Sequence, residues 1–260
     1  MPNLVDYSRI PSTSVEGNVK KPLFNQFNTL SFDVVGTLID FESGILDWFR
    51  PTLANQDIKK TDEDILSSFA RCEDRYQRDA PDKPFTAMLP LIYRDMATEW
   101  NFEASKNEAS GFQHSIRSWP AFPDTVASLD ELKKRYRLVA VTNADAWALK
   151  FMSAKMNDPF DEQLTCDEAG VNKPSPRVFE CLLEKLAPLG VSRGDILHTA
   201  QSQYHDIIPA MKLGFSTMWI ERRHGKGSYG ATPKPDQVAE PTYHAHSMTD
   251  FVQQVRRQDG

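Results

Sequence analysis

Short apolar runs alternate with amphipathic stretches along most of the chain. Apolar runs of strand length indicate strands, and apolar residues three or four positions apart indicate helices. The runs that predict strands lie at 30–33, 137–141, 164–167, 196–200 and 217–220. The segments that predict helices between and after them lie at 124–136, 146–156, 176–186, 206–213 and from 247 onward. This alternation predicts βαβ units, and hence an α/β fold with a mainly parallel sheet.

The stretch between the first predicted strand and residue 118 has a helical pattern instead. A helix around Ile45–Phe49 is expected to end at Pro51, because proline interrupts helices. Thr61 can cap a second helix, which has acidic residues in its first turn. A third amphipathic segment runs from Met88 to Trp100. Further on, Asp124 is expected to cap a helix, and 222–236 has the composition of a surface loop in which His224 is solvated.

These patterns divide the chain into three parts. The predicted parts are an N-terminal tail at 1–28, a sheet domain at 29–41 and 119–260, and a small helical domain at 42–118 that is inserted after the first strand. The apolar face of residues 88–100 could pack in the core of the helical domain or form the interface of a homodimer.

Composition and charge exclude several classes of protein. The 260 residues are 40% hydrophobic and 25% charged, with a net charge of −6. We expect no nucleic-acid partner, because a basic face is missing, and no membrane partner, because no apolar run can cross a bilayer. Residues 1–28 lack the apolar stretch of a signal peptide. The three cysteines form no CxxC pair, so neither disulfides nor a cysteine zinc site is expected, and a reducing cytoplasmic location is favoured.

Polar residues follow the predicted strands where each strand ends. Asp33 ends the first strand, and Thr142 and Asn143 end the next. Lys173 lies in a later connection, and Asp206 lies shortly after the fourth apolar run. Because the carboxyl ends of parallel strands meet at one edge of a sheet, we expect these five residues to share a site.

The residue types suggest a division of roles at this edge. Asp33 is the candidate nucleophile, since a carboxylate there can form a covalent intermediate. Lys173 could keep Asp33 ionised and screen it from Asp206, which could orient or deprotonate a water molecule. Thr142 and Asn143 offer hydrogen bonds to an anionic substrate group. Each residue also has a purely structural alternative: an ordinary turn for Asp33, an exposed loop lysine for Lys173, and helix caps for Thr142, Asn143 and Asp206.

Four motifs in this order resemble the signature motifs of the haloacid dehalogenase-like hydrolase superfamily. They are Phe32–Leu38, Val141–Asn143, Lys173–Pro174 and Gln201–Asp206. The resemblance implies a Rossmann-like core with a movable helical cap at 42–118. It also implies an aspartate nucleophile whose ester or acyl phosphate is hydrolysed by water.

The residue two positions beyond Asp33 separates the branches of this superfamily. Its phosphatases resemble one another in having a second aspartate there, which protonates the leaving alcohol, whereas this chain has Val35. Gln201 and Gln203 stand where carboxylates would help to hold magnesium, and neutral amides are poor ligands for that ion. The chain is therefore similar to the 2-haloacid dehalogenase branch, which implies hydrolysis through an Asp33 ester without a metal or other cofactor.

In this interpretation the partner is a small anionic substrate, and the cap supplies an arginine that accepts the halide. The residues expected to bind substrate are Thr37, Arg71, Thr142, Asn143, Gln201 and Gln203, with Arg75 and Arg78 as alternatives to Arg71. Two other functions stay open. One is a magnesium-dependent phosphatase or phosphonate hydrolase, in which Asp33, the carbonyl of Val35 and Asp206 bind the metal. The other is a small-molecule binding protein without catalysis, since a fold does not dictate function.

Overall fold

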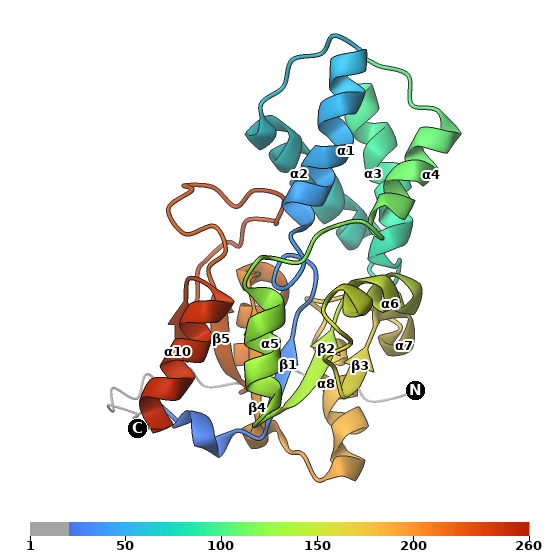
Figure 1. Cartoon of the computed structure of the whole chain (residues 1–260). Coiled ribbons are helices and arrows are strands. Elements are labelled where there is room, and N and C mark those ends of the chain that lie inside the picture. Colours follow the sequence, from blue (N-terminus) through green and yellow to red (C-terminus); the bar gives the residue numbers. More distant parts are fainter. Residues whose placement is uncertain (1–20, 260) are drawn as a thin grey trace, which may run out of the picture.

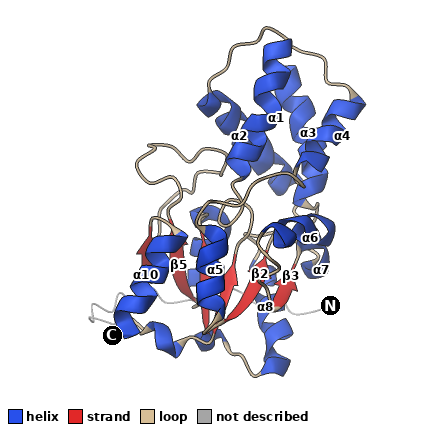
Figure 2. Cartoon of the chain, in the orientation of Figure 1, coloured by secondary structure: helices blue, strands red, loops and turns tan. Residues whose placement is uncertain are grey.

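The fold is a parallel sheet with helices on both faces and a separate group of helices beyond one end of its strands (Figures 1 and 2). The computed structural model describes residues 21–259. The sheet has the order β3-β2-β1-β4-β5-β6, and every neighbouring pair is parallel. The strands are β1 (Thr29–Phe32), β2 (Arg137–Val141), β3 (Glu162–Leu164), β4 (Ile196–Ala200), β5 (Ser216–Ile220) and β6 (Tyr243–Ala245).

Alternate residues of the strands pack into two hydrophobic cores, one on each face of the sheet. On one face, Leu138 and Ala140 share a core with α5 (Thr125–Lys133), α6 (Ala146–Lys155) and α10 (Met248–Asp259). On the other face, Val139 and Val141 pack with α8 (Pro176–Leu186) and α9 (Ile208–Lys212). Burial on both faces explains why these strands are apolar throughout, as is usual in parallel sheets.

Four helices form a unit of their own, which we call the helical unit. They are α1 (Phe41–Asn55), α2 (Asp62–Asp79), α3 (Phe85–Glu99) and α4 (Lys106–Ser115). The unit lies beyond the carboxyl ends of the strands, at the top of Figure 1. Three aromatic residues form its core: Phe49, Tyr93 and Phe112 are completely buried, and their rings contact one another. The apolar face of the 88–100 segment therefore packs in this core.

Several local predictions were wrong. Pro51 does not end α1, because it lies on the exposed side of the helix and the carbonyl without a partner can face water. The side chain of Asp124 does not cap α5; it pairs with Arg222 instead. The third strand ends at Leu164, and a short helix, α7 (Cys166–Ala169), follows it directly.

Two segments at the ends of the chain also differ from the prediction. Most of the predicted tail, residues 1–20, lies outside the described residues, but Phe24 is buried and stacks on Tyr243 with ring centroids 4.3 Å apart. The strand β6, which contains Tyr243, was not predicted, because it has only three residues and the middle one is exposed. No helix among residues 21–259 is long and apolar enough to cross a membrane.

Candidate active site

Asp33 stands at the carboxyl end of β1, where the chain leaves the sheet. Its N–H still pairs with Thr199 O in β4 at 3.0 Å, so the backbone continues the strand as far as the carboxylate. The chain then turns sharply, with Gly36 at φ 94°, a conformation that favours glycine. The N–H groups of Leu38 and Ile39 both bond to Val34 O, which closes the turn. Asp33 is thereby fixed to the rigid sheet.

Lys173 lies between two carboxylates, as the sequence predicted. Its Nζ is 2.8 Å from Asp33 Oδ1 and 2.7 Å from Asp206 Oδ1, and it also donates to Val141 O at 2.9 Å. The side chains of Lys173 and Asp206 are 1% exposed, and that of Asp33 is 8% exposed. With three acceptors around it, the ammonium group is fully hydrogen-bonded. The alternative of an exposed loop lysine is therefore wrong.

A buried histidine holds the second carboxylate. His198 Nε2 lies 3.0 Å from Asp206 Oδ1, and its Nδ1 lies 2.9 Å from Ser31 Oγ. Asp206 belongs to a turn of π-helix, Gln203–Ile207, rather than to the start of the predicted α-helix. Among the described residues, Asp206 Oδ2 is buried and has no hydrogen-bond partner. This oxygen is free to accept a hydrogen bond from a water molecule or to bind a cation.

Burial and the ammonium group set the charges of these residues. Burial alone would raise the pKa of Asp206. Lys173 and His198 have the larger, opposite effect, so the pKa falls below its ordinary value, to about 2. At Asp33 burial outweighs the opposing effect of Lys173, so the pKa of that carboxyl lies above its ordinary value. The pKa of Lys173 is raised: burial lowers it, but the two carboxylates raise it more. The two aspartates are therefore unequal, and Asp206 is the one that remains ionised in acid.

Thr37 supports the carboxylate of Asp33. Its hydroxyl donates to Asp33 Oδ2 at 2.6 Å and accepts from the N–H of Gln201 at 2.8 Å. Asn143 supports the lysine, because its side-chain amide bonds to both the N–H and the carbonyl of Lys173. The Thr142 hydroxyl accepts from the N–H of Ala144. Thr37 and Asn143 thus position Asp33 and Lys173 in this structure.

A cavity of about 40 Å³ opens in front of Asp33. It is lined by Asp33, Val35, Phe41, Glu73, Phe85, Thr142, Asn143, Ala144, Lys173, Gln201, Ser202, His205, Asp206, Thr232 and Pro233. The cavity has room for a few water molecules. The helical unit contributes Phe41, Glu73 and Phe85 to the cavity wall, so we expect movement of this unit away from the sheet domain to widen the access to Asp33.

Three predicted substrate contacts do not line this cavity. Thr37 is buried, and its hydroxyl bonds to Asp33 and to the N–H of Gln201. Arg71 is on the surface of α2, where it pairs with Glu99 at 2.8 Å and its side chain is 60% exposed. The alternatives Arg75 and Arg78 are also exposed and pair with acidic residues. Gln203 is buried, but its amide bonds to the backbone of Ala239 rather than facing Asp33. The sequence pattern did not indicate which side of α2 faces the sheet domain.

The α2 residue that does reach the cavity is Glu73. It is 5% exposed, and no lysine or arginine within residues 21–259 pairs with it. Gln77 Nε2 donates to Glu73 Oε1 at 3.0 Å, and Gln77 Oε1 lies 2.6 Å from His205 Nε2. Burial, with smaller effects of Asp74 and Asp33, raises the pKa of Glu73 to about 8. Glu73 is therefore a neutral acid at pH 7. Sequence reasoning missed it, because one glutamate on a polar helix has no local signal.

The direction of the hydrogen bonds in this chain can be worked out. Burial lowers the pKa of His205 to about 4, so its ring is neutral at pH 7. Gln77 Oε1 can only accept, so His205 Nε2 carries the proton and Nδ1 accepts from Ser202 Oγ at 3.2 Å. In the chain Ser202–His205–Gln77–Glu73, each residue thus donates to the next, and the last acceptor is Glu73 Oε1. Because Oε1 accepts from Gln77, the carboxyl proton of neutral Glu73 is on Oε2, from which it can be donated to a bound molecule.

The fold and the site together define an α/β protein whose polar residues gather at the carboxyl ends of parallel strands. Residues 27–199 match the family model for haloacid dehalogenase-like hydrolases, and the chain belongs to this family. It is 24% identical over 221 residues to (S)-2-haloacid dehalogenase 4A of Burkholderia cepacia, which covers 80% of this chain and 88% of the relative.

Other relatives have different activities. The chain is 27% identical over 123 residues to phosphoserine phosphatase of Thermus thermophilus, which covers 46% of this chain and 48% of the relative. Among solved structures, L-2-haloacid dehalogenase from Xanthobacter autotrophicus matches with a TM-score of 0.71 at 17% identity. That match covers 88% of this chain and 98% of the other, and it confirms the predicted fold class.

Proposed function

We propose that this hydrolase cleaves a carbon–halogen bond in a small 2-haloacid through an ester of Asp33. The observation that carries the proposal is the pairing of Lys173 with both Asp33 and Asp206 in a cavity where Val35 occupies the position two beyond the nucleophile. Valine cannot protonate a leaving alcohol, but a halide ion leaves without a proton. The set Asp33, Lys173 and Asp206 contains its own cation, so it needs no metal ion to hold the two carboxylates together.

The first step forms one bond and breaks another. A carboxylate oxygen of Asp33 attacks the substrate carbon, a C–O bond forms, and the halide departs with the electron pair of the C–halogen bond. In the second step water attacks the carbonyl carbon of the ester and releases the hydroxy acid and Asp33. Asp206 Oδ2, which has no other partner in the described chain, is placed to accept a hydrogen bond from that water. With a pKa of about 2, Asp206 is a weak base, so it orients the water more than it deprotonates it.

The predicted cap arginine is replaced by neutral donors in this proposal. Glu73 and Gln201 both line the cavity, where Gln201 Oε1 accepts from Thr232, and in this proposal the Glu73 hydroxyl and the Gln201 amide donate to the departing halide. Asp145, two positions beyond Asn143, is not part of the cavity wall, and its carboxylate accepts hydrogen bonds from Thr86 and Trp147. The helical unit therefore functions as a cap that contributes hydrogen-bond donors.

A second candidate is the hydrolysis of a phosphate ester. The unpartnered Asp206 Oδ2 supports it, because Asp33, the carbonyl of Val35 and Asp206 could hold magnesium, which would neutralise phosphate charge. The hydroxyl of Glu73 could then supply the proton that Val35 cannot. The first candidate is favoured because three of the four oxygens of Asp33 and Asp206 already accept from Lys173, His198 or Thr37.

Halide release from (S)- and (R)-2-chloropropionate in the presence of a chelator tests the proposal. We expect release from one enantiomer, its loss in Asp33→Asn, and no change in Asp79→Asn, which alters an exposed acid of α2. Turnover in H₂¹⁸O should place ¹⁸O in the carboxylate of Asp33, as detected by peptide mass spectrometry. Absence of halide, together with magnesium-dependent phosphate release that Asp33→Asn abolishes, would establish the second candidate instead.

A further inference from the structure

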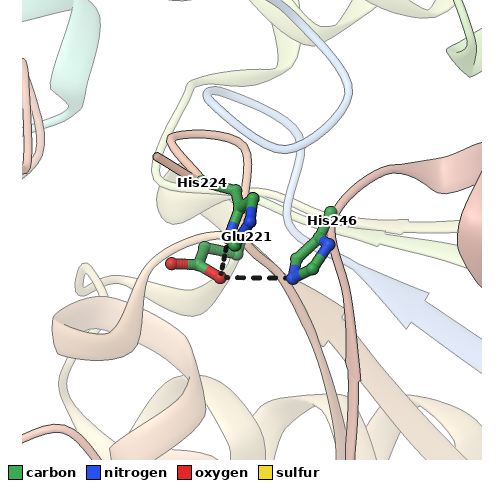
Figure 3. A group of neighbouring side chains, drawn as sticks. All are labelled: Glu221, His224 and His246. Carbon is green, nitrogen blue, oxygen red and sulfur yellow. Dashed lines mark hydrogen bonds and ion pairs between the residues drawn. The ribbon is translucent and has the colours of Figure 1, made fainter. Parts of the chain in front are cut away.

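Three side chains meet on the surface at the far edge of the sheet, away from the active-site cavity. Glu221 follows β5 directly, His224 lies in the turn after it, and His246 follows β6. Figure 3 shows their polar ends turned toward one another. Because β5 and β6 are parallel neighbours, the ends of these strands bring residues 221 and 246 together.

The distances suit a metal ion. Glu221 Oε2 lies 3.1 Å from His224 Nδ1 and 3.7 Å from His246 Nε2, and one ligand atom from each residue lies within 4.8 Å of the others. The rings of His224 and His246 are stacked, with centroids 3.7 Å and planes 17° apart, so one of these exposed rings must rotate before both nitrogens point at one ion. Ligands at about 2 Å from a tetrahedral zinc ion are separated by distances of this order.

A third histidine positions the carboxylate. His244 Nε2 donates to the same oxygen, Glu221 Oε2, at 2.9 Å, and its ring stacks on Trp219 with centroids 4.5 Å apart. Three of the six histidines of the chain thus surround one carboxylate. A hydrogen bond of this kind orients a metal ligand and limits its motion.

We propose that Glu221, His224 and His246 bind a divalent transition-metal ion of the zinc class, with water as the fourth ligand and His244 as a positioning residue. Two imidazoles and one carboxylate favour zinc over magnesium or calcium, which prefer oxygen ligands. The site is distinct from the proposed reaction at Asp33. It was not expected from the sequence, in which His224 reads as a solvated loop residue.

The site would be structural. His224 belongs to the long loop between β5 and β6, and this loop also contributes Arg223, which contacts the helical unit, and Thr232, which lines the cavity. Trp219, beneath His244, donates to Gln201 O at 2.8 Å. A bound ion would tie the start of this loop to the end of β6 and so restrict the segment that closes one side of the active site.

Zinc titration of the full chain without a purification tag tests the proposal, with isothermal calorimetry for stoichiometry and cobalt absorption for geometry. We expect one equivalent to bind, with the intense visible bands of tetrahedral cobalt. His224→Ala or His246→Ala should abolish this binding, and His244→Ala should weaken it about 10-fold. Circular dichroism checks that each variant is folded, which we expect because the substituted histidines are exposed.

Two controls separate this site from other zinc binding. His114→Ala removes an exposed histidine of α4, and Asp33→Asn removes a carboxylate of the cavity; neither should change the affinity. Zinc should also raise the Tm of the wild type but not that of His246→Ala. Unchanged binding in His246→Ala, loss of binding in Asp33→Asn, or no binding at one equivalent would overturn the proposal.

Discussion

At the scale of single residues, the active site combines one buried lysine with three buried carboxyl groups. Lys173 balances one negative charge, but it faces two carboxylates, so the set of three has an excess negative charge in a buried place. Glu73 lies in the same cavity without a cation, and it stays neutral because a further charge there would be costly. A neutral carboxylic acid can donate a hydrogen bond, which an ionised one cannot.

The role of Glu73 predicts the shape of the pH profile. In the proposed reaction Asp33 must be ionised and Glu73 protonated, so activity should rise with pH as Asp33 loses its proton and fall above about pH 8 as Glu73 ionises. Glu73→Gln, which keeps a donor but cannot ionise, should retain most activity and lose the alkaline fall. Glu73→Ala should reduce kcat by about 100-fold. Halide release from pH 5 to 10 is measured for the wild type and both variants. A fall in activity above pH 8 that persists in Glu73→Gln would contradict this role.

His205 makes a separate prediction about stability. Its pKa is lowered from 6.5 to about 4 by burial, so between these pH values the unfolded chain binds a proton that the folded chain does not. Its contribution is therefore complete above pH 6.5 and is lost as the pH falls toward 4. His205→Gln should be less stable than the wild type at pH 7, and this difference should shrink by about 2 kcal/mol at pH 5. Urea unfolding at both pH values measures it; a difference that does not change with pH would contradict the assignment.

At the scale of elements, α1 determines how the helical unit joins the sheet domain. Gly44 in its first turn lies against the buried ring of Trp119, in the segment where the chain returns to the sheet domain. A Cβ atom on residue 44 would lie 2.2 Å from Trp119 Cδ1. The close contact between helix and ring requires glycine at this position, although glycine is a poor helix former.

Gly44→Ala should therefore destabilise the protein even though alanine favours helices. We expect the free energy of unfolding to fall by about 1–2 kcal/mol, because overpacking against the buried ring outweighs the helical gain. Gly111→Ala in α4 is the matched control: its Cβ would approach only the outer edge of Trp48, which is half-buried and can shift. Equal effects of the two substitutions in chemical denaturation would show that the Trp119 contact has no special cost.

At the scale of the whole molecule, charged side chains connect the sheet domain to the helical unit. Arg223, in the loop after β5, pairs with Glu42 at the start of α1 and with Glu63 in α2. The Arg223 and Glu42 side chains are only 11% and 15% exposed, and burial raises the pKa of Glu42 despite the opposing effect of Arg223. A buried carboxylate without its cation is costly.

Arg223→Ala should lower the free energy of unfolding by about 2–3 kcal/mol at pH 7, since it leaves Glu42 buried and unpaired. The loss should be smaller at pH 4, where Glu42 is largely protonated. Arg50→Ala is the control, because it breaks an exposed pair with Asp62 inside the helical unit and should cost less than about 1 kcal/mol. Urea denaturation compares the two, and equal losses would mean that the contact between the two parts adds no more stability than an exposed ion pair.

The sequence by itself determined the alternation of strands and helices and the polar residues at the strand ends. These are local signals, because periodicity reflects burial of each segment and a strand end is marked by the first polar residues after it. Asp33, Lys173 and Asp206 could be grouped in advance, since parallel strands end at one edge. In the structure, Lys173 donates hydrogen bonds to both Asp33 and Asp206 and so joins the three residues.

Only the tertiary structure decided which side of α2 meets the active site and which residues the strand ends β5 and β6 bring together. Arg71 and Glu73 are two positions apart on one helix, and packing of the helical unit turned Glu73 inward and left Arg71 in solvent. Glu221 and His246 are 25 residues apart and meet because β5 and β6 are neighbours. Such contacts depend on the relative placement of distant segments, for which no local pattern carries a signal.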